Sequence, residues 1–159
     1  MRKTCGIYLI NKNDKLLITH PTNHPDFGSW SIPKGEPDSE EEAFLDTAVR
    51  ELLEETGIDL SGMILNPNIK ILPLPNVVYK SGKKTLYSFI VINKELDDID
   101  VVCNSFVNRR DGSRFPENDR HKWVHISHLY MLRQYLHEAQ HVNLEEVYNM
   151  FVKVKNFNK

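Results

Sequence analysis

The amino-acid sequence predicts an α+β sandwich, and three observations favour this fold class. Strand-like segments come first, one amphipathic helix follows them, and further strands precede two helices near the end of the sequence. The chain has 159 residues, of which 40% are hydrophobic and 26% are charged, as is usual for soluble globular proteins. A chain of this length buries roughly 68–70% of its unfolded surface. We therefore expect one domain that spans residues 1–159.

The beginning of the chain is expected to form short strands separated by turn-forming residues. β-Branched and other apolar residues make up two runs, residues 5–10 and 15–19, on either side of the turn-like segment 11–14. Prolines, a glycine, an asparagine and an aspartate predict a loop over residues 21–29. Residues 30–32 then form a short extended segment that ends at Pro33.

The strongest helix signal covers residues 40–56. Ser39 and Glu42 match a capping box, and three glutamates in the first turn interact favourably with the helix dipole. Gly57 supplies the helix stop. Apolar residues at helical spacing create a broad hydrophobic face, which includes Phe44, Ala48 and Leu52.

The rest of the chain is expected to contain more strands, a polar loop and two helices. The strand-like segments are residues 69–74, 76–79, 85–92, 101–108 and 122–126. Residues 81–83 are typical of a hairpin turn. Residues 109–120 are polar, contain Gly112 and Pro116, and are predicted to be a loop. The helices cover residues 128–140 and 144–155, the second with Asn143 as N-cap.

Charge and composition exclude several classes of protein. The net charge is −2, so a dominant nucleic-acid-binding surface is not expected, although a local basic patch remains compatible with this balance. Two cysteines are too few for a disulfide framework and form no CxxC motif. The sequence has no apolar run of the ~20 residues that span a bilayer. The first residues are too polar for a signal peptide, so we expect a cytoplasmic protein without membrane partners.

Three glutamates cluster on the predicted central helix. Glu51, Glu54 and Glu55 fall within an arc of about 100° when residues are placed at 100° intervals. Like charges at these spacings cost an isolated helix roughly 0.2–0.5 kcal/mol per pair. A solvated acidic face is one interpretation of the cluster. The other is a divalent-cation site, because carboxylates suit Mg²⁺ when substrate phosphates complete the coordination.

The sequence around this helix resembles the Nudix box. Residues 35–42 read Gly-Glu-Pro-Asp-Ser-Glu-Glu-Glu, and residues 50–58 read Arg-Glu-Leu-Leu-Glu-Glu-Thr-Gly-Ile. The second segment matches the family pattern in full. Six residues separate Gly35 from Glu42, whereas the pattern has five. Either Glu41 or Glu42 therefore fills the first glutamate position of the box.

The resemblance implies a fold and an activity. The fold would be a Nudix-type α/β/α sandwich with a mixed central sheet and a loop–helix–loop box over residues 35–58. The activity would be hydrolysis of a P–O–P bond, with Mg²⁺ or Mn²⁺, in a nucleoside diphosphate linked to another group. The metal ligands would be Gly35, through its carbonyl oxygen, and Glu51, Glu54 and Glu55. Glu51 would be a ligand or the catalytic base, and Arg50 would hold a catalytic glutamate in place.

A further glutamate is predicted to act from the 109–120 loop. Residues 115–120, followed by Trp123, are similar to the C-terminal part of small bacterial Nudix proteins, and many Nudix enzymes bring a downstream glutamate to the metals. Glu117 is our candidate for this catalytic role. The alternatives are Asp111, Asp119, or a solvated Glu117 without a function.

The substrate-binding prediction includes four residues, which are Lys34, Trp30, Phe27 and Tyr87. Their aromatic members would stack on a base, although burial in the core or at a rim is the more common role of such side chains. The substrate would be a small nucleotide, namely a nucleoside polyphosphate, a dinucleoside polyphosphate or an ADP-ribose-like molecule. Among nucleic acids, only capped RNA ends are candidate substrates. The sequence does not indicate the oligomeric state.

Two other functions compete with this interpretation. A Nudix-like module could bind nucleotide or protein without hydrolysis, although such modules typically lose box glutamates. Residues 137–141 read His-Glu-Ala-Gln-His and match the HExxH motif, in which His137 and His141 would bind zinc and Glu138 would be the base. Only three positions define that motif, so matches by chance are common.

Overall fold

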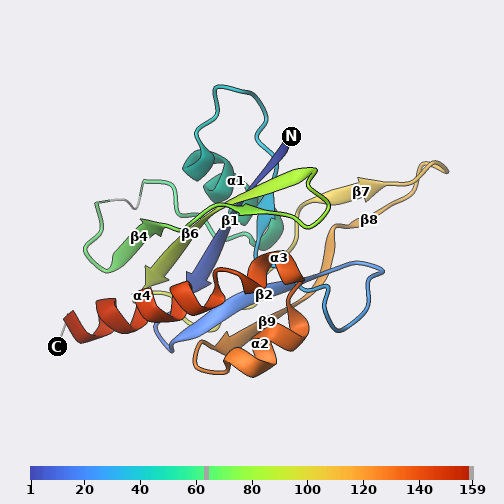
Figure 1. Cartoon of the computed structure of the whole chain (residues 1–159). Coiled ribbons are helices and arrows are strands. Elements are labelled where there is room, and N and C mark those ends of the chain that lie inside the picture. The colour runs from blue at the N-terminus through green and yellow to red at the C-terminus, as the bar shows by residue number, and fades with distance from the viewer. Residues whose placement is uncertain (63–64, 158–159) are drawn as a thin grey trace.

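The computed structural model describes residues 1–62 and 65–157, so residues 63–64 and 158–159 of the predicted domain lie outside the described residues. Along the chain, strands come first, a helix and further strands follow, and helices come last (Figure 1). The elements are β1 (Arg2–Ile10), β2 (Lys15–Pro21), β3 (Lys34–Gly35), α1 (Phe44–Thr56), β4 (Ile69–Pro73), β5 (Val77–Val78), β6 (Lys84–Asn93), β7 (Phe106–Asn108), β8 (Arg114–Pro116), β9 (Asn118–His125), α2 (Leu129–Tyr135), α3 (Glu138–His141) and α4 (Leu144–Phe157).

A mixed sheet forms the middle layer. Its order is β4-β6-β1-β2-β9, with β3 added to β1 and β5 added to β6. The pair β1–β6 is parallel, and the other pairs are antiparallel. β1 is buried from Thr4 to Ile10 on both faces, which explains its continuous apolar run.

Helices cover both faces of the sheet (Figure 1). α1 lies on one face, where Ala48 and Leu52 pack with Leu9 and Leu17. α2 and α4 lie on the other face, where their apolar residues join a second cluster that includes Tyr8. The α+β class and the α/β/α arrangement expected from the sequence are confirmed. The sheet thereby holds β3 and α1, the two halves of the box, against the same strand.

The box helix begins later than predicted. α1 starts at Phe44 rather than Glu40, and Ala43 occupies the N-cap position without a side-chain cap. The predicted capping box is wrong because the Glu42 carboxylate accepts hydrogen bonds from Thr47 and Arg50 instead. The predicted stop is confirmed, since Gly57 has a φ of 78° and closes the helix in the left-handed conformation.

The predicted 109–120 loop contains the turn and second strand of a hairpin and the start of β9, and of the predicted strand 101–108 only residues 106–108 form a strand, β7. β7 and β8 pair antiparallel, and β9 begins at Asn118 and pairs with β2. Polar composition misled the prediction, because the side chains of a projecting hairpin are solvated. Figure 1 shows this hairpin extending away from the sheet.

The predicted helix over residues 128–140 is two helices. Leu136 and His137 both have a ψ of 144°, which interrupts the helical backbone between α2 and α3. Trp30 causes the break, because its backbone donates to the Tyr135 carbonyl and accepts from the His137 N–H. Asn143 directly precedes α4 as predicted, and its side-chain amide donates to the Pro75 carbonyl. Within residues 1–62 and 65–157, no helix has the length and apolar character needed to cross a membrane.

Candidate active site

A cleft of about 460 Å³ opens where β3 and α1 meet the 21–29 loop and the segment after β8. Its walls come from distant parts of the sequence. The lining residues that the site uses are Phe27, Lys34, Glu55, Tyr79, Glu117, Asn118, His137 and Gln140. The cleft therefore combines an acidic end with a wall of aromatic and amide side chains.

Gly35 lies in direct contact with the first box glutamate of α1. β3 pairs with β1 through Gly35 and Cys5, and a Cβ atom added to Gly35 would lie 2.0 Å from Cδ of Glu51. Only glycine leaves room for the carboxylate in this position. The contact brings the backbone of β3 and the Glu51 carboxylate together, as the metal-ligand prediction requires.

Glu55 is the most buried acid of the site. Its exposed fraction is 5%, and its carboxylate accepts a hydrogen bond of 3.2 Å from the backbone N–H of Lys34. Burial raises the pKa of Glu55 to about 8, and the positive charge of Lys34 only partly opposes this. Burial, reinforced by the charge of Glu54, also raises the pKa of Glu51 to about 7. Each carboxylate would be more stable as an anion beside a cation.

Arg50 connects the glutamates of the box. Its guanidinium donates to Glu42 at 3.0 Å, to Glu51 at 3.0 Å and to Glu54 at 3.2 Å. It also donates to the carbonyl oxygen of Glu36 at 2.9 Å. Glu54 is held at the partly exposed side of this network. Arg50 therefore fixes the orientation of Glu51, the role that the family resemblance implies.

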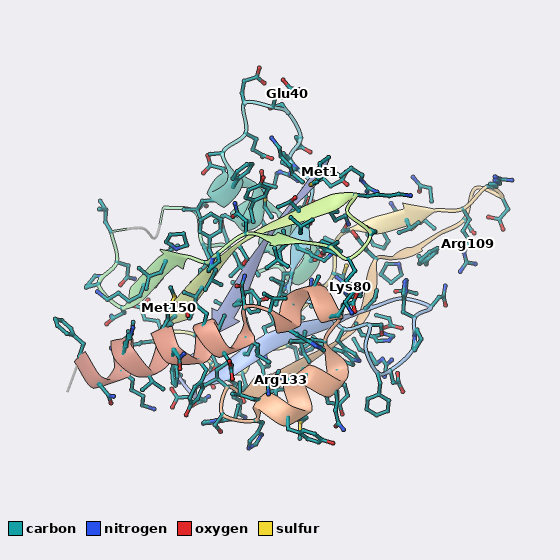
Figure 2. All side chains as sticks on the ribbon, in the orientation of Figure 1. Met1, Glu40, Lys80, Arg109, Arg133 and Met150 are labelled. Atoms are coloured by element: carbon teal, nitrogen blue, oxygen red, sulfur yellow. The ribbon has the colours of Figure 1, made fainter. Side chains whose placement is uncertain are left out.

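Glu42, rather than Glu41, braces the loop before α1. Hydrogen bonds from Arg50 and Thr47 lower the pKa of Glu42 to about 2. Glu41 is exposed. The additional residue relative to the family pattern is accommodated in the exposed loop between Gly35 and Glu42, where Figure 2 labels Glu40 at the far end.

Glu117 reaches the acidic end of the cleft from the base of the β7–β8 hairpin. Its backbone N–H donates to the Ser105 carbonyl at 2.8 Å, and its carboxylate accepts from the Ser105 hydroxyl at 2.6 Å. Its charge contributes to raising the pKa of both Glu51 and Glu55. Glu117 thus lines the same cleft as Glu55.

The donor set fits a hard divalent cation. Within the described residues, no Lys, Arg or His side chain forms a salt bridge with Glu55, and the charge of Lys34 only partly compensates its buried charge. No three His, Cys, Asp or Glu groups in residues 1–62 and 65–157 are gathered tightly enough to hold a metal by themselves. Mg²⁺ usually takes one or two carboxylates together with water and substrate phosphates, so this set suits it.

The opposite wall of the cleft is aromatic and polar. The rings of Tyr79 and His137 are 5.7 Å apart, and Phe27 is exposed at the rim and stacks on Tyr135. Gln140 is fully buried, and its Oε1 atom has no hydrogen-bond partner in the described part of the chain. The sequence analysis did not identify Gln140 as a residue of the cleft, because it predicted one continuous helix over residues 128–140.

The four predicted substrate-binding residues lie in different places. Lys34 and Phe27 line the cleft. Trp30 has an exposed fraction of 1% and belongs to the core. The ring of Tyr87 stacks on Phe44 at 4.0 Å, against α1 and away from the cleft lining. The structure thus assigns these last two to packing, because large apolar rings gain most from burial.

The zinc-peptidase alternative does not fit the structure. His137 precedes α3 as its N-cap, with Nδ1 accepting from the backbone of Ala139. The Nε2 atom of His141 is hydrogen-bonded to the Leu136 carbonyl at 2.7 Å. The two imidazoles therefore do not share a helix face, and both are engaged with backbone groups.

Comparison with known proteins identifies the family. The model of the NUDIX domain matches residues 1–147. The mRNA-decapping protein g5R of African swine fever virus is 28% identical over 156 residues, which are 94% of this chain and 58% of that protein. This chain therefore spans just over half the length of that relative. An uncharacterised 17.7 kDa protein of enterobacteria phage T4 is 29% identical over 136 residues, with 77% of this chain and 85% of the relative covered.

Solved structures support the same fold. An Ap4A hydrolase of C. elegans superposes with a TM-score of 0.65 over 96% of this chain and 98% of that chain, at 19% identity. At this level of identity the likeness concerns the fold alone.

Proposed function

The chain belongs to the Nudix family, and from this premise we propose that it is a Mg²⁺-dependent pyrophosphohydrolase. Its substrate would be a nucleoside diphosphate linked to a further group, cleaved at a P–O–P bond. One observation carries the proposal. The buried Glu55 and the half-buried Glu51 lie beside the backbone of β3, and Glu55 lines a cleft that Glu117 also lines.

The residues that would hold the metal are the carboxylates of Glu51 and Glu55 and the carbonyl oxygen of Gly35. Glu54 remains a candidate ligand, since it is a neighbour of Glu51 in the Arg50 network. A bound Mg²⁺ would neutralise charge on the phosphoryl oxygens and lower the pKa of a coordinated water. Arg50 would keep Glu51 oriented while the substrate enters.

Glu117 would accept a proton from the attacking water. Its carboxylate is exposed and oriented by the Ser105 hydroxyl, whereas Glu55 is buried and suited to a ligand role. A positioned general base contributes typically 10²–10⁴-fold to a rate. Lys34, at the same end of the cleft, would contact a phosphate of the substrate.

The nucleoside would lie against the aromatic wall. Phe27 and Tyr79 offer stacking surfaces, and the free Oε1 atom of Gln140 would accept an N–H of the base. The relatives support substrates of this general kind, since one is named an mRNA-decapping protein and another an Ap4A hydrolase. The candidates are nucleoside polyphosphates, dinucleoside polyphosphates, ADP-ribose-like molecules and capped RNA ends.

A substrate screen tests the proposal. The purified protein is incubated with each candidate class in Mg²⁺ or in EDTA, and products are separated by chromatography. We expect cleavage of at least one class that depends on Mg²⁺ and yields a nucleoside monophosphate or its phosphorylated partner. Binding without cleavage throughout the panel would instead support a silent nucleotide-binding module.

A further inference from the structure

The β7–β8 hairpin projects beside the cleft and has no role in the site described above. Its three strand pairs join Phe106 to Pro116, Val107 to Phe115 and Asn108 to Arg114. Figure 1 shows it extending from the body of the molecule, and Figure 2 places Arg109 on the projecting part. Most residues of the hairpin are exposed, and some of them are apolar. Exposed apolar residues of this kind indicate a surface that is available to a binding partner.

The hairpin concentrates positive charge in a chain whose net charge is −2. Arg109, Arg110 and Arg114 are exposed, and none of them forms a salt bridge within residues 1–62 and 65–157. Asp111 is the acidic residue of this segment, and its carboxylate accepts from the backbone and hydroxyl of Ser113. The three guanidiniums are therefore available to anionic groups.

The same segment orders its arginines on aromatic rings. The guanidinium carbon of Arg114 lies 4.4 Å from the ring centroid of Phe106, and that of Arg109 lies 4.7 Å from the centroid of Phe115. Phe106 retains an exposed fraction of 44%. Arginines that contact phosphates and aromatic faces that stack on bases together bind single-stranded nucleic acid with little sequence preference.

The base of the hairpin connects this surface to the acidic end of the cleft. Ser105 and Glu117 flank the two strands and are joined by two hydrogen bonds. From Glu117 to the tip is about six residues of extended chain, or roughly 20 Å at about 3.3 Å per residue. A single nucleic-acid strand bound along the hairpin would thus contact it through several nucleotides, and the end of that strand would lie at Glu117.

We propose that this hairpin is a binding arm for single-stranded RNA, so that the cleft receives the phosphoanhydride at the 5′ end of an RNA chain. The inference rests on the proposed function and narrows its substrate class. Free nucleotides would use the cleft alone, whereas RNA would use the cleft and the hairpin. Duplex nucleic acid fits less well, because stacking on Phe106 requires unpaired bases.

The test compares a 20-nucleotide RNA carrying a 5′–5′ triphosphate-linked dinucleotide with the free dinucleotide. The variant replaces Arg109, Arg110 and Arg114 with Gln, and a matched control replaces Lys70, Lys94 and Lys153, which are exposed outside the hairpin. We expect the ratio of kcat/KM for RNA to that for the dinucleotide to fall at least tenfold in the arginine variant only. Thermal unfolding verifies that both variants are folded.

Salt dependence gives a second readout from fluorescence anisotropy of the labelled RNA. Each phosphate contact in a single strand contributes about −0.7 to the slope of log binding constant against log salt, so losing three should reduce the slope by about 2. An unchanged slope and an unchanged substrate ratio would overturn the proposal.

Failure of the proposed function would look different. In that case neither substrate would be cleaved by the wild type, while RNA binding would still depend on the three arginines. If the wild type cleaves the dinucleotide but the arginine replacements leave RNA binding unchanged, the proposed function stands and the hairpin is not an RNA-binding arm. A Phe106→Ala variant should weaken RNA binding roughly fivefold through lost stacking, and no loss would also count against the arm.

Discussion

Glu55 and Glu117 are both acids of the cleft, but their surroundings assign them different tasks. Glu55 is buried beside the backbone of Lys34, and no side chain of the described residues forms a salt bridge with it. Glu117 is exposed and held by Ser105. The first environment suits a metal ligand, and the second suits a proton acceptor.

Glu55→Gln should reduce kcat at saturating Mg²⁺ by at least a hundredfold while the protein stays folded. The neutral amide keeps the volume of the side chain and removes the charge that the metal requires, and burial already disfavours that charge. Steady-state hydrolysis measures the loss, and thermal unfolding measures the stability. Glu41→Gln is the matched control, because Glu41 is exposed outside the Arg50 network. Near-wild-type turnover of Glu55→Gln would remove Glu55 from the metal site.

Glu117→Gln should lower kcat more than tenfold, a barrier change of at least ~1.4 kcal/mol. KM should change less, because the lost proton acceptor acts in the transition state. Asp111→Asn in the same hairpin is the control. If KM alone changes, or if neither constant changes, Glu117 is not the base, and that role returns to the box helix.

At the scale of elements, the box consists of β3, the exposed loop and α1, and two contacts hold it together. Arg50 ties the loop to the helix through Glu42 and the carbonyl of Glu36. Gly35 allows β3 to approach Glu51. The first contact mainly affects stability, and the second mainly affects the position of a candidate ligand.

Glu42→Gln should lower the free energy of unfolding by about 1.5–3 kcal/mol at neutral pH, since hydrogen bonds with charged partners are worth roughly this amount. The folded pKa of Glu42, about 2, lies below its ordinary value of 4.5. The stabilisation is therefore complete above pH 4.5 and is lost as the pH falls toward 2. Urea unfolding across this range should show the wild type and variant converging in acid. A difference that persists at pH 2 would mean that the charge of Glu42 is not its cause.

Gly35→Ala should reduce activity more than tenfold with a small effect on stability. The added methyl group would meet the carboxylate of Glu51 at about 2.0–2.3 Å, and this flexible end can move away. Gly6→Ala provides the contrast, because its Cβ would approach the backbone oxygen of Pro33 at 3.0 Å and the side chains of Ile32 and Lys34 at 2.9 Å. We expect Gly6→Ala to lower the melting temperature more than Gly35→Ala does. Full activity of Gly35→Ala would show that the Glu51 position is not critical.

At the scale of the whole molecule, the layers and the box were predictable and the cleft was not. The helix stop at Gly57, the burial of β1 and the glutamate spacing on α1 are local signals that the sequence displays directly. The far wall of the cleft is formed by Phe27, Tyr79 and Gln140, which lie side by side on the cleft although more than a hundred residues separate the first from the last. No local sequence pattern predicts such a long-range arrangement.

The errors have two physical origins. Trp30 pairs its backbone with residues 135–137 and so divides a predicted helix. This long-range contact also takes Trp30 out of the predicted substrate site and into the core. The hairpin of residues 106–116 was missed because solvated polar residues occur in loops and in projecting strands alike.

The whole molecule thus presents an acidic end and an aromatic wall in one cleft, with an exposed basic hairpin beside it. The central claim is that this cleft hydrolyses a phosphoanhydride with a metal-activated water. Hydrolysis in water labelled with oxygen-18, followed by mass spectrometry of the products, tests the claim most directly. We predict that one labelled oxygen enters one phosphate product per cleavage in Mg²⁺, and that EDTA or Glu55→Gln abolishes the reaction. Unlabelled products, or cleavage that persists without metal, would contradict it.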